Sequence, residues 1–131
     1  MSDVMMFEAV GGQKFFDQVV DAFYDAVERD PVLLPLYPEG ADTVGARHRL
    51  AMFLSQYWGG PTTYSDERGH PRLRMRHVPY AIGEIERDHW LLHMVAAIES
   101  ATTLLPDHVR DTVRTDFISY VTNAAEHLRN Q

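Results

Sequence analysis

The chain has 131 residues, of which 45% are hydrophobic and 24% are charged, so the composition predicts one globular domain over residues 1–131. Because the chain contains no cysteine, disulfides, thiol catalysis and cysteine-ligated metal sites are excluded. The formal net charge of −7 argues against nonspecific nucleic-acid binding, which depends on basic surfaces.

The first predicted helix follows Gly11-Gly12. Its large apolar residues recur at three- and four-residue spacing and comprise Phe15, Phe16, Val19, Val20, Phe23, Tyr24 and Val27. This helix must end near Asp30-Pro31, because proline disfavours helical backbone in the residue before it. Residues 31–38 contain three prolines and can therefore hold only short helical turns.

A second helix is predicted from about Thr43 to Trp58, where Gly59-Gly60-Pro61 stops it. The polar, Gly/Pro-rich residues 59–72 that follow are predicted to form a long loop, and loops of that length are often functional. The chain is expected to resume regular structure only after this loop.

Residues 72–79, RLRMRHVP, alternate polar and apolar side chains, which is typical of a half-buried strand. No other segment offers a convincing partner for a strand, however, and an isolated strand is not stable. We therefore predict a short irregular helix bounded by two prolines. In that helix Leu73 and His77 lie one turn apart on the same side.

Two further helices complete the chain. One is predicted over residues 82–101, with an apolar surface that includes Ile85, Trp90, Met94, Ala97 and Ile98. The last begins near Pro106, a favourable residue for a first helical turn, and its apolar stripe is Val109, Val113, Phe117, Val121, Ala124 and Leu128. The predicted fold class is all-α, with four main helices.

Targeting and membrane segments are not expected. The first twelve residues lack a basic region followed by a long apolar run, so a secretory signal is not predicted. No stretch approaches the roughly 20 apolar residues that a transmembrane helix needs, so we expect no membrane partner. Together with the missing cysteines, these features predict a cytoplasmic location.

Recognisable hydrolase and nucleotide-binding signatures are missing, because the chain has no GxSxG, GxxxxGK[ST] or GxGxxG motif. Among the histidines, His48, His108 and His127 are expected to be exposed on helices, and His70 is expected to lie in a loop. The i, i+4 pair His89 and His93 could place two imidazoles on one metal, but Trp90 rules out the HExxH pattern. Without an obvious third ligand, we expect two solvated histidines.

A di-iron carboxylate site is only weakly indicated. Glu86-x-x-His89 resembles half of such a site, but the chemistry needs a second motif on another helix of a bundle. The one other match, Glu67-x-x-His70, lies in the predicted loop.

His77 is a candidate haem ligand. A porphyrin supplies four nitrogens, so a helical protein with an apolar cleft need add only one axial ligand. A neutral imidazole would bind iron through one nitrogen and donate its other N–H to a nearby carbonyl. By spacing alone, a solvated histidine beside arginines is the commoner case, and an all-α interaction module whose RLRMR patch binds an acidic partner remains an alternative.

Four blocks carry a resemblance to a known family: EAVGG (8–12), MFLSQYWGGPTTYS (52–65), RGHPRLRMRHVPY around His77, and IERDHW (85–90). From about Phe7 to Leu128 the chain resembles the truncated, two-over-two haemoglobins, most closely the group II (O-type) branch. The resemblance implies a truncated globin fold, which is a two-over-two helical sandwich around a haem b (iron protoporphyrin IX).

The resemblance also implies roles for individual residues. The family's proximal residue, which binds the haem iron, falls on His77. The distal tyrosines fall on Tyr24 and Tyr37, and the tryptophan diagnostic of this branch falls on Trp90. Their O–H and N–H groups are donors suited to an iron-bound ligand that carries negative charge.

Other positions of the family fall on the helix predicted from about Thr43 to Trp58 and on residues after it. Ala46 falls on the distal position that is histidine in many globins, while the register leaves His48 open as an alternative distal histidine. Arg49 matches a position that can pair with a haem propionate. The remaining expected cofactor contacts are Leu50, Phe53, Leu54, Tyr64, Leu73, Met75 and Met94.

Two classes of function follow from the resemblance. The first is a haem protein that binds oxygen, nitric oxide, carbon monoxide or another diatomic ligand, with slow oxygen release that suits chemistry or sensing better than oxygen transport. The second is a haem enzyme, either a nitric oxide dioxygenase or peroxidase-like. Turnover would need an unidentified reductase, because the chain has no flavin or nicotinamide domain, and a homo-oligomer remains open.

Overall fold

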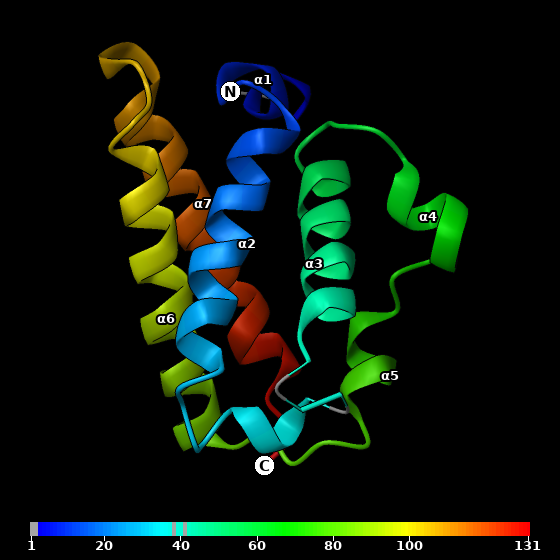
Figure 1. The fold of residues 1–131 in the computed structure, drawn as a ribbon. Helices are drawn as coiled ribbons and strands as arrows, with labels where there is room; N and C mark the ends of the chain where they lie inside the picture. The colour runs from blue at the N-terminus through cyan, green and yellow to red at the C-terminus, as the bar shows by residue number, and fades with distance from the viewer. Residues whose placement is uncertain (1–2, 38, 41) are drawn as a thin grey trace.

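The computed structural model describes residues 3–37, 39–40 and 42–131, and every regular element in it is helical (Figure 1). The predicted all-α class is confirmed, since none of the described residues forms a strand. In chain order the elements are α1 (Asp3–Ala9), α2 (Gln13–Val27), the 3-10 helix η1 (Leu34–Leu36), α3 (Val44–Tyr57), α4 (Thr63–Arg68), α5 (Leu73–His77), α6 (Glu84–Thr102) and α7 (Asp107–Leu128).

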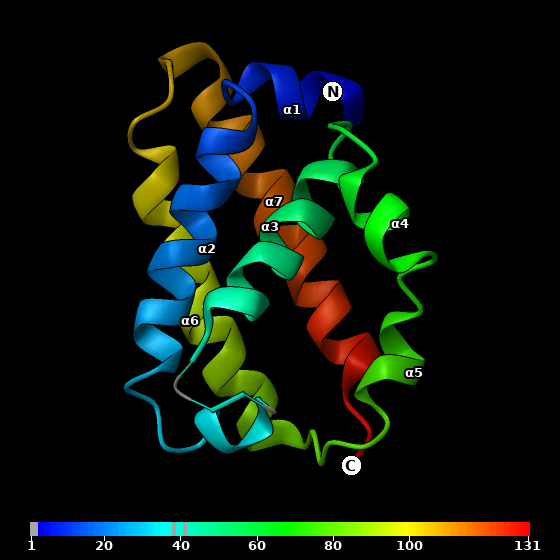
Figure 2. The ribbon, with the colours of Figure 1, turned by 45° about the vertical axis from the view of Figure 1, so that its right-hand side comes forward.

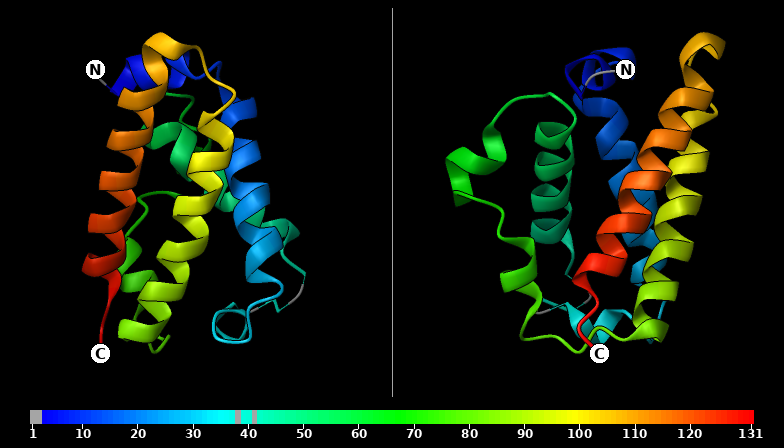
Figure 3. Two further views of the ribbon diagram at one scale, coloured as in Figure 1. Left: turned by 90° about the vertical axis from the view of Figure 1, so that its left-hand side faces the viewer. Right: turned by 180° about the vertical axis from the view of Figure 1, so that it is seen from behind.

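The four long helices form two packed pairs. Helix α2 contacts both α3 and α6, and α6 also packs along α7 (Figures 1 and 3). The α2–α3 and α6–α7 pairs are the two layers of the predicted two-over-two sandwich. Between them lie fully buried rings such as Phe16, Phe23 and Phe117, and each large apolar side chain buried in this way contributes about 1.5–3 kcal/mol.

The predicted helices agree with the structure to within about two residues at most ends, which is the usual uncertainty of helix boundaries. One side chain differs: Ile85, predicted on the apolar surface of α6, is 62% exposed. Within residues 31–38, only Leu34–Leu36 forms a helical turn, and Pro38 lies outside the described residues. No helix in the described part of the chain is sufficiently long and apolar to span a bilayer.

Helix α1 is an element that the sequence pattern did not predict. It crosses the ends of α2 and α3 (Figure 2), where the Phe7 N–H donates to the Trp58 carbonyl at 3.0 Å. The Phe7 ring lies so close to Gly60 that an added Cβ there would be 2.6 Å from it. Gly60 is therefore required for the approach of α1, which explains a glycine at the end of α3.

The predicted loop over residues 59–72 is wrong in part, because Thr63–Arg68 forms α4. The Gln56 side chain on α3 anchors this helix: it donates to Ser65 Oγ at 2.6 Å and accepts from the Ser65 N–H at 3.0 Å. A helix of six residues is too short to show periodicity in sequence and depends on such tertiary contacts.

The short helix predicted within RLRMRHVP is present as α5, which lies beside the C-terminal part of α7 (Figure 2). Arg72 precedes it in the left-handed backbone region, with φ of 45°, and its N–H donates to His70 Nδ1 at 3.1 Å. Non-glycine residues rarely adopt that conformation, so the sharp entry into α5 carries local strain.

Candidate functional site

A cavity of about 590 Å³ lies between α3, α5, α6, α7 and the segment around η1. Its size is within the usual range for small-molecule and cofactor sites. All but one of the site residues expected from sequence line this cavity, namely Tyr24, Tyr37, Ala46, Arg49, Leu50, Phe53, Leu54, Tyr64, Leu73, His77, Trp90 and Met94. The exception is Met75, which α5 turns outward: its side chain is 56% exposed and does not line the cavity, so its prediction as a wall residue was wrong.

The ring of His77 is oriented by its own helix. His77 Nδ1 lies 2.5 Å from the Leu73 carbonyl oxygen one turn earlier, so Nδ1 carries the proton and donates it to that oxygen. In this tautomer Nε2 keeps its lone pair. A histidine that uses one nitrogen on a backbone carbonyl and leaves the other free is prepared to ligate a metal.

The segment after His77 is fastened by a residue from the far end of the chain. The Asn130 side-chain amide donates to the carbonyls of Tyr80 at 2.8 Å and His77 at 3.4 Å, and its Oδ1 accepts from the Ile82 N–H at 2.9 Å. The Asn130 N–H in turn donates to the Ile82 carbonyl at 2.8 Å. We call this group of four hydrogen bonds the Asn130 clamp.

On the other side of the cavity, three aromatic side chains with polar tips come from three elements. Tyr24 stands on α2, Tyr37 follows η1 and Trp90 stands on α6. The Tyr24 and Tyr37 ring centroids are 5.5 Å apart, and Phe23 touches the rings of both Tyr24 and Trp90. The core residue Phe23 thus fixes the two distal rings that come from different helices.

Both distal hydroxyls stay protonated at neutral pH. Burial raises the pKa of Tyr24 to about 12, although a hydrogen bond with Tyr37 and the charge of Arg49 act in the opposite direction. Burial likewise raises the pKa of Tyr37 well above its usual value, against a hydrogen bond with Trp90 that lowers it. Each hydroxyl therefore remains a hydrogen-bond donor under ordinary conditions.

Helix α3 presents Ala46, and not His48, to the cavity. Ala46 is buried and lines the cavity. The His48 side chain is 53% exposed, and its Nε2 lies 2.9 Å from a carboxylate oxygen of Glu67 on α4. The alternative of a distal His48 therefore disagrees with the structure, because its ring is used to join α3 to α4 at the surface.

Four arginines line the cavity, namely Arg49, Arg68, Arg76 and Arg87. Arg49 pairs with Glu39 at 2.7 Å, while Arg76 donates to the backbone carbonyls of Pro71 at 2.8 Å and Arg68 at 3.2 Å. Guanidinium groups at the edge of an apolar cavity suit a ligand that carries carboxylates. Sequence reasoning selected Arg49 but not the other three, although the position of Arg76 next to His77 was a signal that could have included it.

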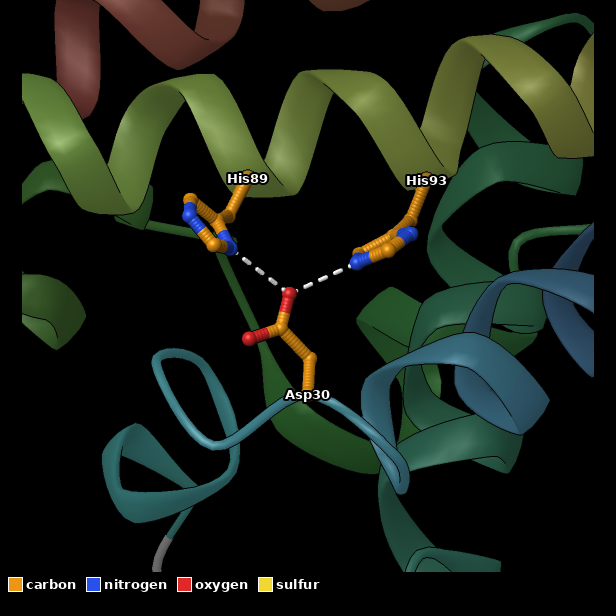
Figure 4. A group of neighbouring side chains, drawn as sticks. All are labelled: Asp30, His89 and His93. Atoms are coloured by element: carbon orange, nitrogen blue, oxygen red, sulfur yellow. Dashed lines mark hydrogen bonds and ion pairs between the residues drawn. The ribbon is translucent and has the colours of Figure 1, made fainter.

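The pair His89 and His93 does not consist of two solvated side chains, so that prediction was wrong. Both rings on α6 bond to the buried carboxylate of Asp30, which follows α2 (Figure 4): His89 Nδ1 lies 2.8 Å and His93 Nε2 2.7 Å from Asp30 Oδ2. Burial raises the Asp30 pKa, but the hydrogen bonds from His89, His93 and Val32 outweigh it and hold that pKa well below its usual range. We call these three residues the Asp30 cluster.

The di-iron interpretation also disagrees with the structure. Glu86 caps its own helix, because its carboxylate accepts a hydrogen bond from the Gly83 N–H at 2.7 Å. Glu67 is paired with His48 instead of lying near His70. Neither glutamate joins the histidine three residues after it.

Comparison with known proteins identifies the family. Residues 5–127 match the family described as bacterial-like globin. The chain belongs to the bacterial-like globins. Group 2 truncated hemoglobin YjbI of Bacillus subtilis (strain 168) is 35% identical over 127 residues, which cover 95% of this chain and 88% of that relative. The predicted membership of the group II truncated haemoglobins is confirmed.

Solved globin structures share the whole fold. A thermostable hemoglobin from the actinobacterium Thermobifida fusca has a TM-score of 0.87 and 48% identity, with 99% of this globin and 98% of that chain covered. The truncated oxygen-avid haemoglobin from Bacillus subtilis has a TM-score of 0.82 and 34% identity, with 95% and 98% covered. The two-over-two fold expected from sequence is confirmed.

Membership of this family implies a haem cofactor and ligand binding at the haem, and the residues of the cavity fit that group. The walls are mostly apolar, one imidazole exposes an unprotonated nitrogen, and the lining arginines can meet the acidic side chains of a porphyrin. Leu73 and Phe53 supply apolar wall on α5 and α3. The donor set is that of a single axial ligand, not of a closed metal site.

Proposed function

We propose that this globin binds dioxygen at a ferrous haem b held by His77, and that Tyr24, Tyr37 and Trp90 slow oxygen release. The observation that carries the proposal is the arrangement of one cavity, with a pre-oriented imidazole on α5 and three polar aromatic tips from α2, the η1 segment and α6. Bound haem would supply the iron to which the diatomic ligand attaches.

His77 has two tasks in this proposal. Its Nε2 would ligate the iron, and its Nδ1–H bond to the Leu73 carbonyl holds the ring in place and makes the imidazole a better electron donor. Arg49, Arg68 and Arg76 would meet the propionates at the edge of the cavity. None of these contacts depends on which diatomic ligand is bound.

The distal residues provide the retention. A diatomic ligand bound at the haem would carry partial negative charge on its outer atom, so the hydroxyls of Tyr24 and Tyr37 and the indole N–H of Trp90 would stabilise the bound state. Each such hydrogen bond is worth roughly 1 kcal/mol net, which corresponds to about a five-fold slower release. The Bacillus subtilis relative is described as oxygen-avid, and its likeness to this globin supports the same behaviour here.

Retention of oxygen favours chemistry or sensing over oxygen transport, because a carrier must release its cargo. A peroxidase-like activity would benefit from a distal acid–base residue, and the one candidate for it, His48, is exposed and paired with Glu67. Nitric oxide dioxygenation would use the same distal donors, and its test is conversion of nitric oxide to nitrate by the oxygenated protein.

The deciding experiment measures oxygen dissociation by rapid mixing of the oxygenated protein with an oxygen scavenger and carbon monoxide. Tyr24→Phe and Trp90→Phe each remove one donor while keeping an aromatic ring, so we expect oxygen release to become roughly five-fold faster in each. Tyr57→Phe is the matched control, because Tyr57 is 40% exposed and is not among the residues that line the cavity. Unchanged rates in both distal variants, or an equal increase in the control, would contradict the proposal.

A further inference from the structure

The Asp30 cluster lies outside the residues that line the haem cavity and has no part in the function proposed above. Three donor atoms, Asp30 Oδ2, His89 Nδ1 and His93 Nε2, lie within 4.8 Å of one another. Two imidazole nitrogens and a carboxylate oxygen are a common ligand set for Zn²⁺ and other first-row transition metals. We propose that the Asp30 cluster is a binding site for a divalent transition-metal ion of the zinc class.

The two histidines are placed for chelation by helix geometry. Residues four apart on an α-helix lie one above the other on the same face, so His89 and His93 reach the same point from one rigid element (Figure 4). Helix α6 has 19 residues and packs against both α2 and α7, so the spacing of the pair is set by the core.

The carboxylate is oriented by the backbone. Asp30 Oδ1 accepts hydrogen bonds from the N–H groups of Val32 at 2.8 Å and Leu33 at 3.4 Å. This turn leaves Oδ2 directed toward the two imidazoles, in the manner of outer hydrogen bonds that hold metal-binding carboxylates. The carboxylate is thus in position before any ion arrives.

Charge and access also favour a cation. Among the described residues, no lysine or arginine pairs with Asp30, whose side chain is only 7% exposed. A buried carboxylate without a fixed counter-charge gains from a cation close to its oxygen. The His89 side chain is 38% exposed, so an ion can reach the cluster from solvent.

In the metal-free state, Asp30 Oδ2 accepts an N–H from each imidazole at 2.8 Å and 2.7 Å. The ion would replace those two protons: each neutral ring moves its proton to the other nitrogen, or releases it if the ring is charged. Three protein ligands leave a fourth position of a tetrahedral ion for water. The bound ion would join the turn after α2 to helix α6, through His89 before Trp90 and His93 after it.

The test is calorimetric titration of the haem-loaded, tag-free chain with Zn²⁺. We expect one saturable site per chain, with binding about tenfold weaker or more in His93→Gln and Asp30→Asn. Asn at position 30 keeps an oxygen for the Val32 and Leu33 N–H groups, so this variant removes charge and not the turn. His48→Gln is the matched control, because it breaks the His48–Glu67 pair on the other side of α3 and should leave the titration unchanged.

Zinc-edge anomalous diffraction of a soaked crystal gives the position directly. The expected peak lies at roughly 2.0–2.2 Å from Asp30 Oδ2, His89 Nδ1 and His93 Nε2. Failure of Zn²⁺ to saturate a site, equal weakening by His48→Gln and His93→Gln, or a peak at another group of residues would overturn the proposal. These outcomes do not depend on oxygen binding, so they leave the proposed function untouched.

Discussion

Tyr24 and Trp90 stand on helices of 15 and 19 residues, whereas His77 ends a helix of five residues, none of which is buried. The distal residues take their positions from the core, through contacts such as Phe23 against both rings. His77 takes its position from hydrogen bonds: one to the Leu73 carbonyl and those of the Asn130 clamp. The distal wall is therefore supported by packing and the proximal wall by a small number of polar contacts.

This difference has a physical consequence. Packed aromatic rings lose several kcal/mol when displaced, whereas each exposed hydrogen bond contributes about 0.5–1.5 kcal/mol. Local unfolding of the proximal helix α5 should therefore cost less free energy than unfolding of any other part of the site. Substitutions on the proximal side should change the rate of haem loss. Substitutions on the distal side should change the rate of ligand release and leave the haem in place.

The largest expected effect is on His77 itself. His77→Gly removes the proposed axial ligand and should abolish the histidine-ligated absorption spectrum and tight haem binding, measured by Soret absorbance and the rate of haem loss. Added imidazole should restore a ligated spectrum, because it fills the vacated space with the same donor. His108→Ala, an exposed histidine on α7, is the control. Persistence of the wild-type spectrum in His77→Gly would rule out this ligand.

The long helices could be predicted from sequence because their apolar residues repeat over many turns. The repeat is clear in α2, from Phe15 to Val27, and in α7, from Val109 to Val121. Both helices begin close to the predicted residues. Helices α1 and α4 could not be predicted, because six or seven residues show no period and their stability comes from contacts distant in sequence.

The site was predicted by resemblance more than by pattern. Spacing placed Leu73 and His77 one turn apart, but the family match singled out His77 from the exposed histidines. Met75 was misassigned because a five-residue helix between two prolines has an orientation that its neighbours decide. Asp30 was missed as a partner of His89 because the two residues are 59 positions apart, and no local pattern connects them.

The Asn130 clamp offers a second, smaller way to separate the two walls. Asn130→Ala removes three side-chain hydrogen bonds to the segment that follows His77, so we expect haem loss to become roughly five-fold faster with the oxygen dissociation rate unchanged. Transfer of haem to an excess of an acceptor globin measures the first quantity. Asn123→Ala, an exposed asparagine on α7, should change neither. An oxygen rate that shifts with haem loss would show that the two walls are coupled.

The burial of the distal wall can also be tested through the pH dependence of stability. The Tyr24 pKa is about 12 in the folded chain and near 10.0 when unfolded, so the folded state binds the proton more tightly. A raised folded pKa contributes stability that is fully present below pH 10 and is lost as the pH rises through 12. At pH 11 this loss is about 1.4 kcal/mol for Tyr24.

Guanidinium unfolding at pH 9 and pH 11 measures the loss, and Tyr24→Phe should reduce it because phenylalanine has no proton to lose. Burial also raises the pKa of Tyr120 to about 12, so the wild-type loss contains a similar part from α7, which Tyr120→Phe removes separately. The two reductions should add, since the tyrosines stand on different helices and share no direct contact among the ring pairs of the described residues. An unchanged loss in Tyr24→Phe would mean that solvent reaches this hydroxyl, and the distal wall would then be as loosely supported as the proximal one.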